Sequence, residues 1–198
     1  NQILKSVEKV LGPMGKAPAA WLKTASPADI KKALGRFKHR FTTAEEMAVF
    51  LLNIKRALAG HGSLEKLFLK GYDEKEPTVE EALYRFINAF NTQACAPTLT
   101  PCPEHKSSFK RVNLFLRWMV RKDAVDPGVW TGVSPAKLII PLDTHMRQVS
   151  MNMGITKRKD TSMKTAVEIT AFFGTLMPAD PVKYDFALTR AGIRGNNV

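Results

Sequence analysis

Lys110 and Asp143 are the two residues whose type and position best suit chemistry. Lys110 follows two serines that could cap a helix, and the apolar residues behind it repeat with helical periodicity. A cation in the first turn opposes the helix dipole, which disfavours the charged ammonium form. That placement suits an amine that must be neutral to act as a nucleophile. The alternative is a frayed helix end, with Lys110 in solvent or against a phosphate.

Asp143 ends an apolar run and opens a predicted helix, within residues 137–147, KLIIPLDTHMR. Aspartate is a preferred N-cap, so capping alone would explain its position. A catalytic role is compatible with capping, because a capping carboxylate is held in one orientation and stays ionised. Asp143 is therefore a second residue that could take part in chemistry, beside Lys110.

The composition favours a polyanionic partner. Lys and Arg number 30 against 18 Asp and Glu, which gives a formal net charge of +12. Such an excess binds phosphates through counterion release, although it does not distinguish DNA, RNA and acidic membranes. Hydrophobic residues make up 44% of the chain, which excludes a disordered tail. The longest apolar run, Met47–Leu52, is far shorter than the roughly 20 residues that span a bilayer. With no secretory signal visible, we expect a cytoplasmic protein that does not enter membranes.

Three basic clusters predict a phosphate-binding surface. They lie at 106–122, 35–41 and 157–159, and the first contains no acidic residue. A solvated face is the alternative for any one of them. The residues expected to contact nucleic acid are Lys106, Ser107, Ser108, Arg111, Arg117, Arg36, Lys38, Arg40, His145 and Arg147. Phe37 or Phe41 could stack on bases, although core packing is the favoured interpretation of both.

Cysteine and histidine usage predicts neither a metal nor another cofactor. Cys95 and Cys102 are the only cysteines, and the composition favours free thiols. The four histidines lack the spacing of metal ligands.

The pattern of caps and periodicity predicts an all-α fold with about nine or ten helices. Ser26-Pro27 and the capping box at Thr43 mark two starts, and Asp143 and Thr161-Ser162 mark others. Alternating strands joined by hairpin turns are not recognisable. RNA-recognition folds, which depend on a sheet, are therefore disfavoured.

Four segments carry a resemblance to a known superfamily. Phe109–Lys122, Val125–Trp130, Ser134–Val149 and Pro181–Leu188 resemble an uncharacterised bacterial family within the helix-hairpin-helix DNA glycosylase superfamily. The segment Pro141–His145 is similar to the Val-Asp-Thr-His segment that carries the catalytic aspartate of endonuclease III-like enzymes. The resemblance implies two helical lobes flanking a cleft, residues 26–121 forming one and 1–25 with 122–198 the other. Two cysteines cannot build the four-cysteine iron–sulfur cluster of many relatives.

The resemblance also implies an activity. In bifunctional superfamily members a lysine at the start of the helix after the hairpin forms a Schiff base and a later aspartate assists, which maps onto Lys110 and Asp143. Their spacing of 33 residues is longer than in endonuclease III and closer to the archaeal 8-oxoguanine glycosylases. We therefore expect a monomeric base excision repair enzyme, a DNA glycosylase and AP lyase that removes an oxidised purine, 8-oxoguanine favoured, from double-stranded DNA. Phe115 and Trp118 are candidates for the base pocket, and the expected location is the bacterial cytoplasm, at the nucleoid when bound to DNA.

The hairpin is where the chain departs from the superfamily. Pro103–Ser108 stands in place of the usual Leu-Pro-Gly-x-Gly, and Lys106 with Ser107 or Ser108 would replace some phosphate contacts. Two alternatives stay open beside the bifunctional enzyme: a monofunctional glycosylase that uses Asp143 and water, and a non-catalytic DNA-binding protein with the same fold. Lys137 is the fallback nucleophile.

Overall fold

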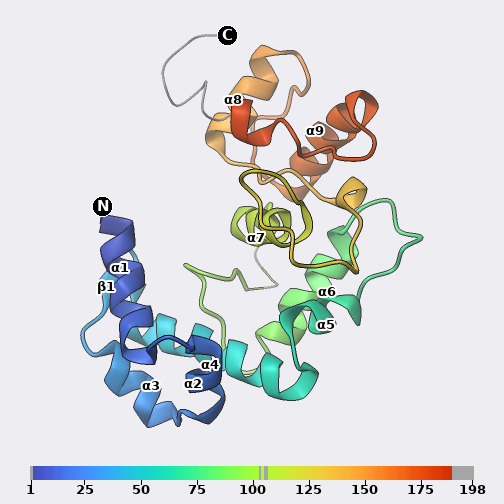
Figure 1. Ribbon diagram of the computed structural model, residues 1–198. Coiled ribbons are helices and arrows are strands. Elements are labelled where there is room, and N and C mark those ends of the chain that lie inside the picture. The colour runs from blue at the N-terminus through green and yellow to red at the C-terminus, as the bar shows by residue number, and fades with distance from the viewer. Residues whose placement is uncertain (1, 103, 105–106, 189–198) are drawn as a thin grey trace. The chain divides into compact units, whose positions relative to one another are not determined.

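The computed structural model describes residues 2–102, 104 and 107–188, and within them the chain is mostly helical (Figure 1). The predicted all-α class is confirmed at this level. The helices are α1 Gln2–Leu11, η1 Gly12–Met14, α2 Pro18–Thr24, α3 Pro27–Leu34, α4 Ala44–His61, α5 Leu64–Leu69, α6 Glu80–Phe90, α7 Lys110–Val120, η2 Pro135–Lys137, α8 Thr144–Asn152 and α9 Met163–Leu176. None of these helices is long and apolar enough to cross a membrane.

One short hairpin interrupts the helical pattern, so the expectation of no strand pairing was wrong. Strand β1, Lys38–His39, pairs antiparallel with β2, Thr42–Thr43. The two-residue turn between them consists of Arg40 and Phe41. Neither residue is the glycine or asparagine that usually signals such a turn, which is why the sequence pattern missed it.

The chain divides into two compact units. Unit 1 contains residues 1–70 and 85–103, and unit 2 contains 71–84 and 104–198. This division differs from the expected lobes. Residues 1–25 belong with the following helices of unit 1, and α7 belongs to unit 2 together with Asp143. Both members of the candidate catalytic pair are therefore carried by one compact unit.

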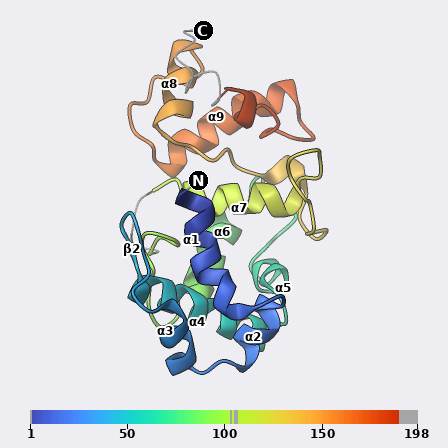
Figure 2. The ribbon, with the colours of Figure 1, turned by 60° about the vertical axis from the view of Figure 1, so that its left-hand side comes forward.

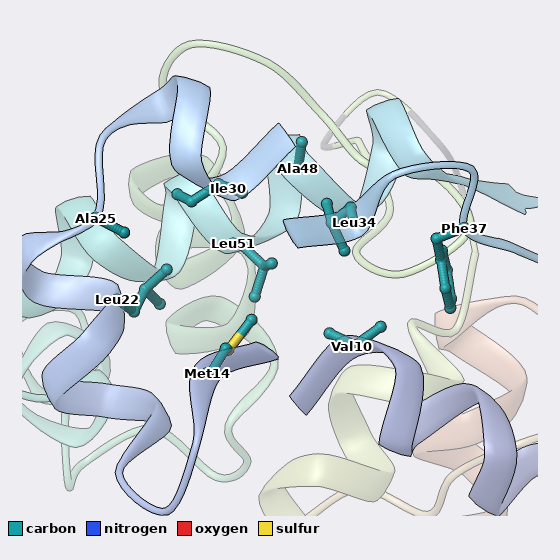
Figure 3. Packing of buried hydrophobic residues seen from close by; sticks show 9 residues of the cluster. All are labelled: Val10, Met14, Leu22, Ala25, Ile30, Leu34, Phe37, Ala48 and Leu51. Carbon is teal, nitrogen blue, oxygen red and sulfur yellow. The ribbon is translucent and has the colours of Figure 1, made fainter. Parts of the chain in front are cut away.

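Unit 1 is built around α4, which packs against the helices that precede it. Figure 3 shows buried side chains from several segments meeting in one cluster. Its members are Val10, Met14, Leu22, Ala25, Ile30, Leu34, Phe37, Ala48 and Leu51. The predicted caps are present here: Ser26 forms a reciprocal capping box with Asp29, and Thr43 Oγ1 accepts a hydrogen bond from Glu46 N–H at 3.3 Å. The capping box predicted at Thr43 is not formed, because the Glu46 carboxylate accepts hydrogen bonds from Thr98 instead. Cys95 and Cys102 are free thiols.

Unit 2 contains α7, α8 and α9 (Figure 2) and buries the apolar run that precedes Asp143. Residues 138–142 form neither helix nor strand and are almost inaccessible to solvent. Ile140 N–H donates a hydrogen bond of 3.0 Å to Thr170 Oγ1 on α9, so a buried backbone donor in this segment has a partner. This anchoring fixes where the chain emerges at Asp143.

Candidate active site

Asp143 is the N-cap of α8. Its Oδ1 accepts a hydrogen bond from Met146 N–H at 2.8 Å, and its own carbonyl accepts one from Arg147 N–H at 2.9 Å. The predicted cap is therefore confirmed. Because the preceding segment is buried and the first turn of α8 binds one carboxylate oxygen, the second oxygen has a fixed direction.

Lys110 is the first residue of α7, as the sequence predicted, but no serine caps the helix. The N-cap is Phe109, which has a left-handed backbone (φ 48°) and makes no side-chain cap bond. Phe109 is 1% exposed, and its ring packs edge-on against Tyr84 at 5.0 Å between centroids. Burial of the Phe109 ring stabilises this unfavourable backbone conformation. The next side chain, Lys110, points outward with 45% of its surface exposed.

The two side chains meet. Lys110 Nζ donates a hydrogen bond of 2.7 Å to Asp143 Oδ2, across 33 residues of sequence. Ser108 Oγ donates a second bond, of 3.2 Å, to the carbonyl of Leu142, so the chain before α7 is joined to the chain before α8 at two adjacent points. The result is an amine paired with a carboxylate at a place that solvent and ligands can reach, since Asp143 retains 22% exposure.

The surroundings of Asp143 favour its ionised form. Partial burial acts to raise the pKa of Asp143, but the hydrogen bond from Lys110, the Met146 N–H and the charge of Lys110 outweigh it, with a further contribution from His145. The net effect lowers the pKa of Asp143 below its usual value. Asp143 is thus a carboxylate that can balance developing positive charge.

Asp185 is a further acidic residue of this region, which the sequence did not single out as a site residue. It is 5% exposed, and Arg117 Nη1 donates a 3.0 Å hydrogen bond to its Oδ2. Burial raises the pKa of Asp185 to about 6, although the positive charge of Arg117 acts to lower it. The negative charge of Asp143 adds to the rise, and the positive charge of Lys110 reduces it. The candidate pair and Asp185 therefore lie within electrostatic range of one another. An acidic residue among the apolar residues of 181–188 was the available signal.

Two residues expected on the nucleic-acid surface are buried instead. Arg117 is 4% exposed and is ion-paired with Asp126 at 3.3 Å as well as with Asp185. Ser108 is also 4% exposed, and its hydroxyl is committed to the Leu142 carbonyl. The prediction that these two contact phosphates was wrong, because both side chains satisfy partners inside unit 2.

The other expected contact residues are accessible. Those of unit 2 are Ser107, Arg111, His145 and Arg147, and those of unit 1 are Arg36, Lys38 and Arg40. Ser107 and Arg147 are partly buried, and an Arg147 guanidinium N–H donates to the carbonyl of Lys159. Lys106 lies outside the described residues. For all the accessible residues, contact with nucleic acid stays a prediction.

The aromatic candidates for a base pocket lie further along α7. Trp118 is 43% exposed, and Phe115 packs edge-on against Trp130 with ring centroids 5.5 Å apart. Eight residues of helix separate Trp118 from Lys110, a rise of about 12 Å. Part of the Phe115 ring is thus used in packing, and a base-binding role for either residue stays a prediction.

Lys137 is engaged elsewhere. Its Nζ donates to the carbonyl of Glu74 and, at 2.5 Å, to that of Glu76, while its own carbonyl accepts from Val79 N–H at 2.9 Å. These bonds tie the segment before α6 to η2. Lys137 Nζ thus has two backbone carbonyl partners, and a nucleophilic role for this residue stays a prediction.

An open polar pocket of about 440 Å³ begins at the residue after Asp143. The first turn of α8 and the N-cap of α9 both contribute to it. Its lining residues are Ser107, Thr144, Arg147, Lys159, Asp160, Thr161 and Ser162. The volume is within the range of small-ligand sites, and the lining side chains include the cations Arg147 and Lys159 as well as the carboxylate of Asp160. No cluster of histidine, cysteine and acidic side chains suited to a metal ion occurs in the described part of the chain.

Comparison with known proteins gives one match. A family model described as "Protein of unknown function (DUF2400)" matches residues 1–194. No curated protein and no solved structure is detectably similar to the chain. The match spans both compact units, so Lys110, Asp143 and Asp185 all fall within the part that defines the family.

Proposed function

The chain belongs to the DUF2400 family, and we propose that it is a DNA glycosylase with AP lyase activity. The observation that carries the proposal is the 2.7 Å contact between Lys110 Nζ and Asp143 Oδ2. Imine chemistry at a sugar carbon needs at least a lysine nucleophile and an adjacent carboxylate. The helix-hairpin-helix glycosylase fold is part of the same proposal, supported by the helical architecture and by the order of the two residues along the chain.

The first stage breaks the bond between base and sugar. Lys110 passes a proton to Asp143, which leaves a neutral amine beside a carboxylic acid. The Nζ lone pair forms a bond to C1′ as the C1′–base bond breaks, and the departing electron pair takes the proton from Asp143. The regenerated carboxylate balances positive charge on the sugar and then accepts a proton from the newly bonded nitrogen.

The second stage cuts the strand. The sugar ring opens as O4′ is protonated, which gives an iminium between C1′ and Lys110 Nζ. Loss of the C2′ proton expels the 3′ phosphate with the electron pair of the C3′–O bond. Water then hydrolyses the iminium and restores the free amine.

The proposed substrate is an oxidised purine in duplex DNA, flipped out of the stack so that its sugar reaches Lys110. The net charge of +12 supports a DNA partner. In unit 2, Arg111 and His145 are exposed beside the two catalytic candidates, and Arg147 lines the adjacent polar pocket. These three residues are proposed to bind the phosphates that flank the flipped nucleotide.

A second candidate is a monofunctional glycosylase. A salt bridge stabilises the ammonium form of a lysine, whereas attack on carbon needs the neutral amine. The observed Lys110–Asp143 ion pair therefore also suits a resting arrangement in which Asp143 activates water and Lys110 only orients it. This enzyme would release the base without cutting the strand.

Borohydride trapping on a panel of lesion-containing duplexes tests both candidates. Borohydride reduces an iminium to a stable amine, so the bifunctional enzyme is expected to give a covalent adduct on an 8-oxoguanine duplex, with the modified peptide containing Lys110. Lys110→Arg keeps the charge and should abolish the adduct, while the neighbouring change Arg111→Gln should weaken DNA binding but still give it.

The other outcomes of the trapping experiment distinguish the remaining candidates. Base release with neither nick nor adduct would establish the monofunctional enzyme. An adduct that persists in Lys110→Arg would refute the assignment to this residue. Salt-sensitive DNA binding with no base release from any lesion would reject catalysis and leave a DNA-binding protein.

A further inference from the structure

The β1–β2 hairpin of unit 1 is anchored on both sides but exposed at its tip. Before β1, Phe37 points into the core of unit 1 (Figure 3) and is 8% exposed. In β2, Thr42 is equally buried, and its Oγ1 lies 2.8 Å from Thr98 Oγ1. His39 Nδ1 lies 2.8 Å from Ser6 Oγ. The two turn residues, Arg40 and Phe41, are therefore presented on a fixed base.

The tip adopts an unfavourable conformation for its residue types. Arg40 has a positive φ of 53°, in the left-handed region that glycine or asparagine normally occupies in two-residue hairpin turns. A β-carbon is disfavoured there. Packing of Arg40 does not explain the choice, because its side chain is exposed.

Phe41 is the most exposed large apolar side chain of the described residues, at 86%. A single exposed apolar residue is common on protein surfaces. Here it directly follows a strained arginine, at a turn position that glycine would occupy without strain. The unfavourable backbone conformation of Arg40 and the exposed ring of Phe41 indicate that both side chains contact another molecule.

The charge around the hairpin tip indicates which kind of molecule binds there. Arg36, Lys38 and Arg40 are all exposed, and residues 35–43 contain no aspartate or glutamate. Lys31 and Lys32, on the last turn of α3, are exposed as well. Cations that alternate with an aromatic ring match a sugar-phosphate backbone that carries stacked bases.

We propose that the hairpin is a nucleic-acid-binding finger, in which Phe41 stacks on an unpaired base while Arg36, Lys38 and Arg40 bind the adjoining phosphates. The finger belongs to unit 1 and does not depend on the Lys110–Asp143 pair of unit 2. Stacking of this kind tolerates any base, because every base has a π-face. The finger therefore recognises unpaired nucleotides rather than a sequence.

Fluorescence anisotropy with two labelled DNA probes tests the finger: a single-stranded oligonucleotide and a duplex with one unpaired base. Phe41→Ala should weaken binding by about 5- to 140-fold, which corresponds to 1–3 kcal/mol per stacked base at 1.4 kcal/mol per tenfold. Phe41→Trp should retain affinity. The control is Phe172→Ala, which removes a partly exposed aromatic ring from α9 and should leave affinity unchanged.

The salt dependence separates stacking from phosphate binding. Phe41→Ala should keep the slope of log affinity against log salt, whereas Lys38→Gln should lower that slope by roughly one. Folding is not at risk from a side chain that is 86% exposed, and circular dichroism of each variant checks this. Equal affinities of Phe41→Ala and the parent protein on both probes would overturn the proposal, as would Phe41-dependent binding of an acidic peptide in preference to DNA.

The test is independent of catalysis. Anisotropy is measured on undamaged DNA, where no base is released. If the anisotropy test fails while borohydride trapping succeeds, only the finger proposal is rejected. If the anisotropy test succeeds while trapping fails, only the lyase proposal is rejected.

Discussion

Arg117 Nη1 lies 3.0 Å from Asp185 Oδ2, and both side chains are almost completely buried in unit 2. Arg117 also faces Asp126, at 3.3 Å from Nη2 to Oδ2, and Asp126 is 0% exposed. The Arg117 guanidinium thus faces two buried carboxylates, and Arg121 Nη1 also donates to Asp126 Oδ2. Because Lys110 and Arg117 lie two turns apart on α7, this network supports the helix that begins at the candidate active site.

Arg117→Met is expected to destabilise the protein by about 3 to 5 kcal/mol, because buried Asp185 loses the Arg117 ion pair, while Asp126 keeps its ion pair with Arg121. The measurement is the free energy of unfolding in urea. Lys122→Met is the matched control: the side chain is exposed, so its removal should change stability by no more than about 0.5 kcal/mol. Equal losses from the two variants would contradict the buried network.

Asp185 should make stability depend on pH. Its pKa is raised from 3.8 to about 6 in the folded protein, so between these values the folded state binds more protons than the unfolded state. Stability from this residue is therefore complete below pH 4 and is lost as the pH rises through 6, by up to roughly 3 kcal/mol. Asp185→Asn cannot titrate and should lack this loss. Parallel curves of unfolding free energy against pH for the two proteins would contradict the assignment.

The local parts of the site were predictable from the sequence, whereas its tertiary parts were not. The Asp143 cap and the position of Lys110 at a helix start follow from short-range patterns. Their contact depends on the path of the intervening chain, and only the resemblance suggested it. Arg117 was placed on the surface because residues 106–122 form a basic cluster without an acidic residue, yet its partners Asp126 and Asp185 lie 9 and 68 positions further along the chain. The hairpin was missed because Arg40 and Phe41 replace the residues that usually mark such a turn.

Asp143 allows capping and catalysis to be separated. Asn is as good an N-cap as Asp, so Asp143→Asn should keep the bond from Met146 N–H and change stability by less than about 1 kcal/mol. It removes the charge that would accept the Lys110 proton, so base release should fall by about 100- to 10,000-fold. Asp143→Ala should lose activity and also about 1 kcal/mol of stability. Single-turnover rates and urea unfolding of both variants provide the comparison, and full activity in Asp143→Asn would exclude a catalytic carboxylate.

Lys137 offers the reciprocal case, a lysine that is expected to matter for structure and not for chemistry. Its Nζ binds the carbonyls of Glu74 and Glu76, and Lys137→Met would leave these two acceptors without that donor. We expect a loss of about 1 to 3 kcal/mol in unfolding free energy. Proteolysis should become faster within 71–79, because the segment keeps only the backbone bond from Val79 N–H to the carbonyl of residue 137. The borohydride adduct should form at the parental rate at temperatures where the variant is folded. If the adduct is lost while the fold and the protease resistance of 71–79 are intact, Lys137 rather than Lys110 is the nucleophile.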